Sequence, residues 1–387
     1  MLSTGVHDVP RAERLVYGRP AGDVLGEAIR EAGWRKVFAI TTRSVQASEL
    51  MTTLGAAAGT ALAGSYAGIA AHSPIESVLN AADAARSVDA DVLLAVGGGS
   101  AIDAAKAVQM CLAQDLRTQD ELLAHARRGA AGRSESAPHL RIVAVPTTLS
   151  AAEFTSIAGV TDVSRGVKHA LESPYLVPQL VIMDPRATLY TPERLLLGTG
   201  IRAVDHCVEA ICSISPTPFG NATAREGLSL LSRGLRALKA DPDDLDARLN
   251  CQLGAWMAIS GPASGVPMGA SHAIGRVLGG AYGVPHGETS CVMLAGALTW
   301  NAPADDGAQA RVIAAMGGGH SSAADAVRAL VHELGLPTRL ADVGVKLTQF
   351  DEIASKSLAM LRVPSTSGNR RPISSTDDVK EILELVA

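Results

Sequence analysis

Three consecutive glycines, Gly97, Gly98 and Gly99, lie between an apolar run at residues 92–96 and a helix-favouring run at residues 101–107. The short apolar run is typical of a buried parallel strand. Without side chains, the turn lets backbone N–H groups approach an anion closely, and the following helix directs its positive end at the same place. We therefore expect the turn to bind a phosphorylated small molecule, the alternative being an ordinary tight strand-to-helix turn.

This glycine run matches neither of the generic phosphate-binding motifs. Ile102 stands where the dinucleotide fingerprint has its third glycine, and the run comes too late in the chain for a first strand–helix unit. No Gly-Lys-Ser/Thr sequence follows, so the run is not a P-loop either. The expectation of phosphate binding therefore depends on the local backbone and not on a motif.

A second candidate element is the hydroxyl-rich segment that follows the apolar run at residues 141–145, with Thr147, Thr148 and Ser150. It would lie at the carboxyl edge of the sheet, where open α/β sheets bind their ligands. Threonine hydroxyls there can donate hydrogen bonds to a phosphate or an amide. The alternative is an ordinary Ser/Thr turn.

Three histidines and two arginines have the spacing of a shared site in the second half of the chain. Arg202 and His206 are four residues apart, as are His272 and Arg276, so each pair lies on one face of a predicted helix. His286 ends a glycine-rich stretch. A single histidine of this kind is more often structural, but three among small residues indicate a site.

Alternating strand and helix patterns position these elements in the first half of the chain. We expect strands at residues 36–41, 61–64, 92–96, 141–145 and 180–183, and helices at residues 22–32, 75–87 and from residue 101. Strands separated by helices predict an α/β fold whose parallel sheet is covered on both faces.

Long helical patterns replace this alternation after residue 185. We therefore expect an α/β nucleotide-binding domain at residues 1–185 and an all-α C-terminal domain at residues 186–387. A cleft between two such domains is a common place for a ligand. The last helix has its own start signal, because Ser375 precedes Asp377 and Asp378 as an N-cap precedes first-turn acids.

Composition and charge exclude several classes of protein. The 387 residues are 47% hydrophobic with a net charge of −5, which fits about two globular domains and no nucleic-acid or membrane surface. No apolar run is long enough to span a membrane, and residues 1–14 lack the apolar core of a signal peptide. The charge-dense segment at residues 125–133 is interpreted as a solvated connector. Five cysteines without CxxC spacing predict reduced core thiols in a cytoplasmic protein and no zinc site.

The motifs, taken in order, resemble those of the iron-containing alcohol dehydrogenase family. The chain contains GGGSAIDAAK, PTT followed by Glu-x-Thr, Asp-Pro, GIRAVDHCVEA, SHAIGRVLGG and PHG. The gap between PTT and Glu153 is one residue shorter than in the common alcohol dehydrogenases, and HSP at residues 72–74 and NRRP at residues 369–372 also fit the maleylacetate reductase branch. The resemblance covers nearly the whole chain and implies a nicotinamide cofactor in the cleft and a homodimer.

The same resemblance implies which residues contact the cofactor. It places around the pyrophosphate Gly98, Gly99, Ser100 and Asp103, near the phosphate and nicotinamide Thr147 and Thr148, and near the ribose Lys168. The strand end at Thr42 has no acid to accept the adenosine ribose hydroxyls, and Arg43 could pair with a 2′-phosphate. We expect NADH or NADPH, with NADPH favoured, the alternative being that Arg43 is merely solvent-exposed.

The chain departs from the family at the metal. The family holds its metal with an aspartate and three histidines, which His206, His272 and His286 match, but Arg202 stands at the aspartate position. Arg276 replaces a histidine that is often present four residues after His272. A permanently charged guanidinium beside a divalent cation is costly. We therefore expect no metal and a site that holds a small anionic substrate.

Without a Lewis acid, hydrogen-bond donors must stabilise the developing alkoxide. We expect Arg202 or Arg276 to bind a substrate carboxylate. One histidine would protonate the oxygen as hydride arrives from C4 of the nicotinamide, in the order of preference His272, His206, His286.

The leading hypothesis is an NAD(P)H-dependent, metal-independent reductase of a small carbonyl compound that bears a carboxylate. Arg202→Ala would then lose activity mainly through substrate binding. The alternative for this site is that Arg202 only forms a salt bridge with Asp205 or Glu209 and that the site has lost its function. A second hypothesis is a redox-inactive relative that catalyses cyclisation, dehydration or elimination on an anionic intermediate, and a third is an inactive binding partner. The intact GGGS and PTT elements favour the first.

Overall fold

The computed structural model describes residues 12–126 and 138–387. Contacts divide the chain into two compact units, and the chain passes from one unit to the other between Thr191 and Pro192. The expected boundary at residue 185 falls at the start of a 3₁₀ helix, Pro185–Tyr190, that belongs to the N-terminal unit. Most of the predicted connector at residues 125–133, and most of residues 1–14, lie outside the described residues.

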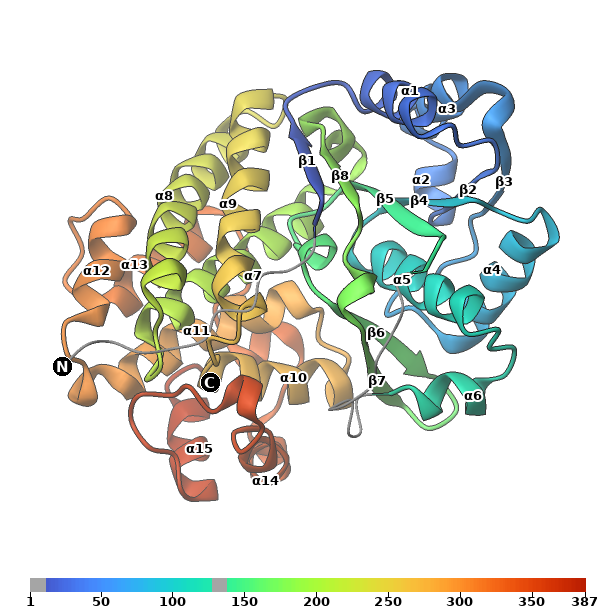
Figure 1. Cartoon of the computed structure of the whole chain (residues 1–387). Helices are drawn as coiled ribbons and strands as arrows, with labels where there is room; N and C mark the ends of the chain where they lie inside the picture. Colours follow the sequence, from blue (N-terminus) through green and yellow to red (C-terminus); the bar gives the residue numbers. More distant parts are fainter. Residues whose placement is uncertain (1–11, 127–137) are drawn as a thin grey trace. The chain divides into compact units, whose positions relative to one another are not determined.

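The N-terminal unit is built on a six-stranded sheet whose order is β1-β8-β5-β4-β2-β3, and every neighbouring pair is parallel (Figure 1). The strands are β1 Arg14–Tyr17, β2 Val37–Ile40, β3 Leu62–Tyr66, β4 Val92–Gly97, β5 Arg141–Pro146 and β8 Leu180–Met183. The central strand β4 is buried along its whole length, which explains its unbroken apolar sequence.

Helices cover both faces of this sheet, as predicted. They are α1 Ala21–Ala32, α2 Arg43–Gln46, α3 Glu49–Ala58, α4 Ile75–Ser87, α5 Gly99–Ala113 and α6 Gln119–Ala124. Alternate side chains of β4 enter two different cores: Leu93 packs in one with α4 and α5, and Leu94 packs in the other with α1 and α3. The sheet therefore sets the positions of the strand ends and of the helices that follow the strands.

The sequence predictions omitted the helices α2, α3 and α6 of this unit, as well as its weaker strands. The edge strand β1 has four residues and is half-exposed, so it has no apolar run. An antiparallel hairpin, β6 Ile157–Asp162 and β7 Val167–Glu172, also lies outside the predicted parallel pattern. Its buried face alternates with exposed and small residues, which gives a weak signal.

The described part of the C-terminal unit is helical, with no strand, as predicted (Figure 1). Its helices are α7 Glu193–Cys212, α8 Pro218–Ala240, α9 Leu245–Ala263, α10 Ala270–Tyr282, α11 His286–Asn301, α12 Ala308–Ala315, α13 Ala323–Glu333, α14 Phe350–Met360 and α15 Thr376–Glu384. Ser375 caps α15 in a reciprocal capping box with Asp378, which confirms the start signal in the sequence.

The cysteines occupy core positions, as expected. All five are free thiols, four of them buried and Cys212 partly buried. In the part of the chain that the structure describes, no helix has the length and hydropathy to cross a membrane.

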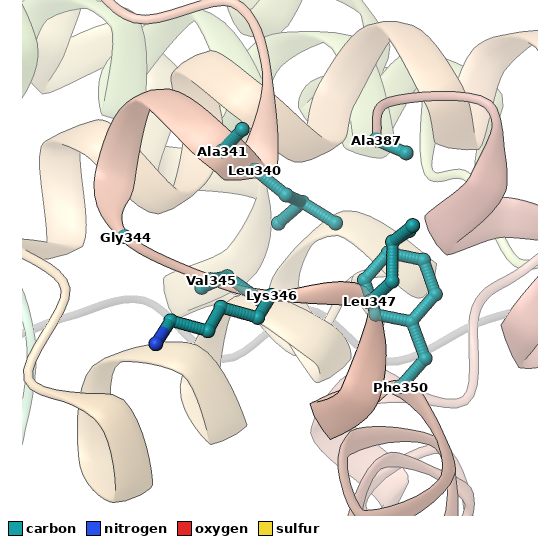
Figure 2. A pocket seen from close by; sticks show the side chains of 8 residues that line it. All are labelled: Leu340, Ala341, Gly344, Val345, Lys346, Leu347, Phe350 and Ala387. Atoms are coloured by element: carbon teal, nitrogen blue, oxygen red, sulfur yellow. The ribbon is translucent and has the colours of Figure 1, made fainter.

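An apolar hollow of about 340 Å³ opens beside α14 (Figure 2). Figure 2 shows Leu340, Val345, Leu347 and Phe350 around it, with the Lys346 side chain extending away. None of the residues predicted to act chemically lines it.

A glycine contact sets the spacing of α7 and α11, the two helices that carry Arg202 and His286. A Cβ on Gly287 would lie 2.5 Å from the backbone carbon of Gly198. No side chain fits there unless the helices move apart, so the two glycines hold the backbones close together.

We predict that Gly287→Ala lowers the free energy of unfolding by about 2 kcal/mol, because the added methyl group overpacks a backbone contact. The matched control is Gly280→Ala in α10, where a Cβ meets nothing within 4 Å. That variant should be neutral or up to about 1 kcal/mol more stable, since alanine is the better helix former. Chemical denaturation measures the free energy of unfolding of both variants. Equal stability would contradict the claim that the contact at Gly287 has no room for a side chain.

Candidate active site

The glycine turn and the hydroxyl-rich segment lie against each other in the N-terminal unit. Gly97 ends β4 with a φ of 145°, and a Cβ on Gly98 would lie 2.8 Å from Thr148 Cγ2. A Cβ on Gly99 would lie 3.2 Å from Ser150 Oγ. Side chains are therefore excluded from the turn by the neighbouring segment as well as by the backbone.

Two hydroxyls in this contact are buried without a protein partner. Thr148 Oγ1 and Ser150 Oγ have no hydrogen-bond partner among the described residues. A buried polar group in this state is costly, so such groups mark places that a ligand completes. Together with the N-terminus of α5, they form a donor set that fits the phosphate of a nucleotide.

The other predicted cofactor residues lie at the same sheet edge. Thr41 Oγ1 donates to Val96 O (2.8 Å), which joins the ends of β2 and β4. The next residue, Thr42, caps α2 by accepting a hydrogen bond from Val45 N (3.4 Å), and Arg43 beside it is exposed.

Ser100, Asp103 and Lys168 extend this edge. Ser100 Oγ accepts from His72 N (3.0 Å), and Asp103 Oδ2 accepts from Gly159 N (3.1 Å). The Lys168 side chain crosses Gly159 so closely that a Cβ there would clash with it. Burial raises the pKa of Asp103, while the nearby lysines oppose that shift. All the predicted cofactor residues therefore belong to the N-terminal unit, where Lys168 lies on the separate β6–β7 hairpin.

The C-terminal unit brings together the two foremost candidate histidines. The rings of His206 on α7 and His272 on α10 have centroids 4.8 Å apart and are tilted by 33°. Nδ1 of His206 and Nε2 of His272 are buried without a hydrogen-bond partner in the described parts of the chain. Burial, followed by the positive charges of His272, Arg202 and Arg276, holds the pKa of His206 well below its ordinary value.

Glu209 fixes the orientation of His272. Its carboxylate accepts hydrogen bonds from the backbone N–H groups of Gly269 (2.8 Å) and Ser271 (2.8 Å) at the start of α10. Glu209 Oε2 also lies 2.7 Å from His272 Nδ1. Because a carboxylate oxygen accepts, Nδ1 carries the hydrogen and Nε2 is the nitrogen left for other chemistry.

Asp205 is the counter-charge on the same face of α7. It accepts from Ser271 Oγ (2.9 Å) and Ser290 Oγ (2.6 Å), and its Oδ2 lies 3.4 Å from His272 Nδ1. Burial alone would raise the pKa of Asp205, but His272, Arg202 and Ser290 outweigh it and hold that pKa below its usual range.

Arg202 is engaged inside the protein. Its Nη1 donates to Ser290 Oγ (3.1 Å) and lies 3.6 Å from Asp205 Oδ2. The salt bridge with Asp205, which was the alternative interpretation of this residue, is therefore present. The Arg202 guanidinium is therefore a partly buried cation near the imidazoles.

Arg276 and His286 are less buried than His206 and His272. Arg276 is exposed on α10, and its Nη1 donates to Ser365 Oγ (3.2 Å). His286 is half-buried at the start of α11 and lies against α10, where a Cβ on Gly279 would be 3.0 Å from His286 Cε1.

Sequence reasoning missed the roles of Asp205, Glu209 and Ser290. The spacing of Arg202, Asp205 and Glu209 on one helix contained a signal, and it was interpreted only as an alternative salt bridge. Ligand-type atoms of Asp205, Glu209 and His272 lie within 4.8 Å of one another. They are already joined to each other and to serine hydroxyls or backbone N–H groups.

Comparison with known proteins gives the family. A model described as iron-containing alcohol dehydrogenase matches residues 12–185, and one for the C-terminal part of Fe-containing alcohol dehydrogenases matches residues 196–386. The chain belongs to the iron-containing alcohol dehydrogenase family and is an oxidoreductase, as the sequence motifs predicted.

Relatives point to one branch of this family. A maleylacetate reductase from Sphingobium indicum is 30% identical, over 94% of this chain and 92% of the relative. A solved putative alcohol dehydrogenase from Ralstonia eutropha has 30% identity and a TM-score of 0.84, covering 100% of this chain and 98% of that one. A maleylacetate reductase from Rhizobium sp. has 26% identity and a TM-score of 0.82, covering 100% and 98%. The resemblance to the maleylacetate reductase branch is confirmed.

We predict that Glu209→Gln lowers the free energy of unfolding by about 2 kcal/mol, because a neutral amide weakens three charge-assisted contacts and presents an N–H group to buried donors. The control is Glu352→Gln, which removes an exposed pair with Lys356 and should change stability by less than about 0.5 kcal/mol. Chemical denaturation of both variants is the measurement. Equal losses would show that the Glu209 carboxylate does not hold α10.

Proposed function

We propose that the protein is an NAD(P)H-dependent, metal-independent reductase of a small carbonyl compound that carries a carboxylate. The observation that carries this proposal is the partly buried Arg202 guanidinium near the His206 and His272 imidazoles. The similarity to proteins named maleylacetate reductase supports reduction of a carbonyl compound.

The residues of the site do not fit a divalent metal. Burial, and then the charges of His272 and Arg202, already lower the pKa of His206, and a metal ion would add to the repulsion from Arg202. Of the two nearby acids, Glu209 accepts from backbone N–H groups and Asp205 Oδ2 accepts from two serine hydroxyls, while Asp205 Oδ1 has no hydrogen-bond partner among the described residues. We therefore derive no step through a metal.

The substrate carboxylate is assigned to Arg276. Arg202 contacts Asp205 and Ser290 inside the protein, whereas Arg276 is exposed, donates to Ser365 Oγ and lies one helical turn after His272. A guanidinium binds a carboxylate through a charge-assisted pair of hydrogen bonds. The sequence left open whether Arg202 or Arg276 binds the substrate carboxylate, and we choose Arg276.

His272 is the proposed proton donor. A bound NAD(P)H supplies hydride to the carbonyl carbon. The imidazolium form of His272 gives a proton from Nε2 to the carbonyl oxygen and is left neutral, with Nδ1–H still bonded to Glu209. The positive charge of Arg202 favours negative charge developing on that oxygen. His206, kept neutral by its lowered pKa, remains a neighbour and not the donor.

The coenzyme is proposed to be NADPH in preference to NADH. Thr42 and the exposed Arg43 follow the end of β2, and no carboxylate stands at those positions. An arginine there can pair with a 2′-phosphate. The unpartnered hydroxyls of Thr148 and Ser150 support a bound nucleotide.

We predict that protein freed of metal by a chelator still oxidises NADPH in the presence of small oxo acids. Absorbance of the reduced nicotinamide measures the rate with each oxo acid and with the matched ketone that lacks the carboxylate. kcat/KM should be at least about tenfold higher for the acid, because a charge-assisted hydrogen bond contributes about 1.5–3 kcal/mol.

The variant Arg276→Gln should remove this preference by raising KM for the acid and leaving the ketone unchanged. Loss of activity on chelation, with recovery on stoichiometric Fe²⁺ or Zn²⁺, would contradict the metal-independent mechanism. Binding of NADPH with no turnover of any carbonyl compound would favour the non-redox alternative.

A further inference from the structure

A buried lysine in the N-terminal unit takes no part in the chemistry proposed so far. Lys106 lies on α5, is fully buried, and donates from Nζ to the carbonyl oxygens of Ala152 (2.6 Å), Thr155 (2.7 Å) and Ile157 (2.9 Å). An ammonium group has three hydrogens, so these carbonyls satisfy it. Burying a charge is costly, and a purely packing role would be filled by an apolar side chain.

One partner of Lys106, the carbonyl of Ala152, ends the segment that carries the unpartnered hydroxyls, and the other two follow it within five residues. Thr147 N donates to Gly97 O (3.0 Å) at one end of that segment, and Ala152 O accepts from Lys106 at the other. Between them, Ala151 has a φ of 57°, a left-handed conformation that costs a non-glycine residue about 1–2 kcal/mol. Lys106 therefore binds the carbonyl directly after the strained residue and opposes its relaxation.

The alternative role for Lys106 is that of a counter-charge for the acids nearby. Asp103 and Glu153 do face it, and burial raises the pKa of Glu153 to about 7. However, Glu153 Oε2 has no hydrogen-bond partner in the described part of the chain, whereas the ammonium hydrogens go to backbone carbonyls. Its hydrogen bonds therefore act on the backbone of the segment.

We infer that Lys106 is a positioning residue of the cofactor site: it fixes residues 147–152 so that Thr148 Oγ1 and Ser150 Oγ stand ready at the glycine turn for the diphosphate of the nicotinamide cofactor. Gly98 and Gly99 contact these two side chains, so a shift of the segment would open the site. Holding the donors in place before the ligand arrives lowers the cost of binding. The inference rests on the proposed function only in that a nicotinamide cofactor binds here.

The test is Lys106→Met, which keeps most of the side-chain volume and removes the ammonium. Fluorescence of the reduced nicotinamide gives Kd for NADPH, and competition gives Kd for ADP and for adenosine. We expect NADPH and ADP to bind at least about tenfold more weakly to the variant, with adenosine unchanged. At saturating NADPH, kcat should stay near that of the wild type. The control Lys346→Met changes an exposed lysine of the other unit and should alter none of these values.

Comparing ADP with adenosine distinguishes a positioning role of Lys106 from a packing role, because a general loss of structure would weaken the binding of both ligands alike. Equal weakening of both, or unchanged NADPH binding, would overturn the inference. If Lys106→Met does not fold, Lys106→Gln is measured in the same way, since an amide has only two hydrogens and removes at least one of the three bonds to backbone carbonyls. An unchanged ratio of ADP to adenosine affinity would then overturn it. Failure of the wild type to bind NADPH or NADH would instead contradict the proposed function.

Discussion

The C-terminal site depends on the hydrogen bonds that the Glu209 carboxylate accepts. This carboxylate joins α7 to the first N–H groups of α10 and holds the ring of His272 through Nδ1. A carboxylate at a helix N-terminus interacts favourably with the unpaired N–H groups and the helix dipole. The consequence of the bond to His272 is chemical: the nitrogen of His272 that remains for a substrate is Nε2. Asp205 and Arg202 then place one negative and one positive charge beside the same ring.

The two units contribute different parts of the chemistry. The N-terminal unit offers a glycine turn, the start of α5 and two unsatisfied hydroxyls, which suit a phosphate. The C-terminal unit offers a fixed imidazole, a partly buried guanidinium and an exposed one, which suit an anionic carbonyl compound. Backbone packing underlies both, because Gly98 and Gly287 occupy contacts that exclude any side chain.

Much of the fold could be predicted because its signals are local. The helix at residues 75–87 and the strand at residues 180–183 were placed at the residues where the structure has them, since a helical pattern marks the first and a short apolar run marks the second. The edge strand β1 and the β6–β7 hairpin escaped, because half-exposed strands carry weak patterns. The site was harder. Helical spacing indicated the arginine–histidine pairs, but nothing in the sequence shows that Ser290 on α11 would reach Arg202 and Asp205, or that Ala151 would be left-handed.

The location of the hydrogen on the His272 ring tests the account most directly. Neutron diffraction from deuterium-exchanged crystals would show it. The account predicts a deuteron on Nδ1 directed at an ionised Glu209, with no metal bound to either ring nitrogen. A deuteron on the Glu209 carboxyl with Nδ1 bare, or a metal ion coordinated by Nε2, would contradict it.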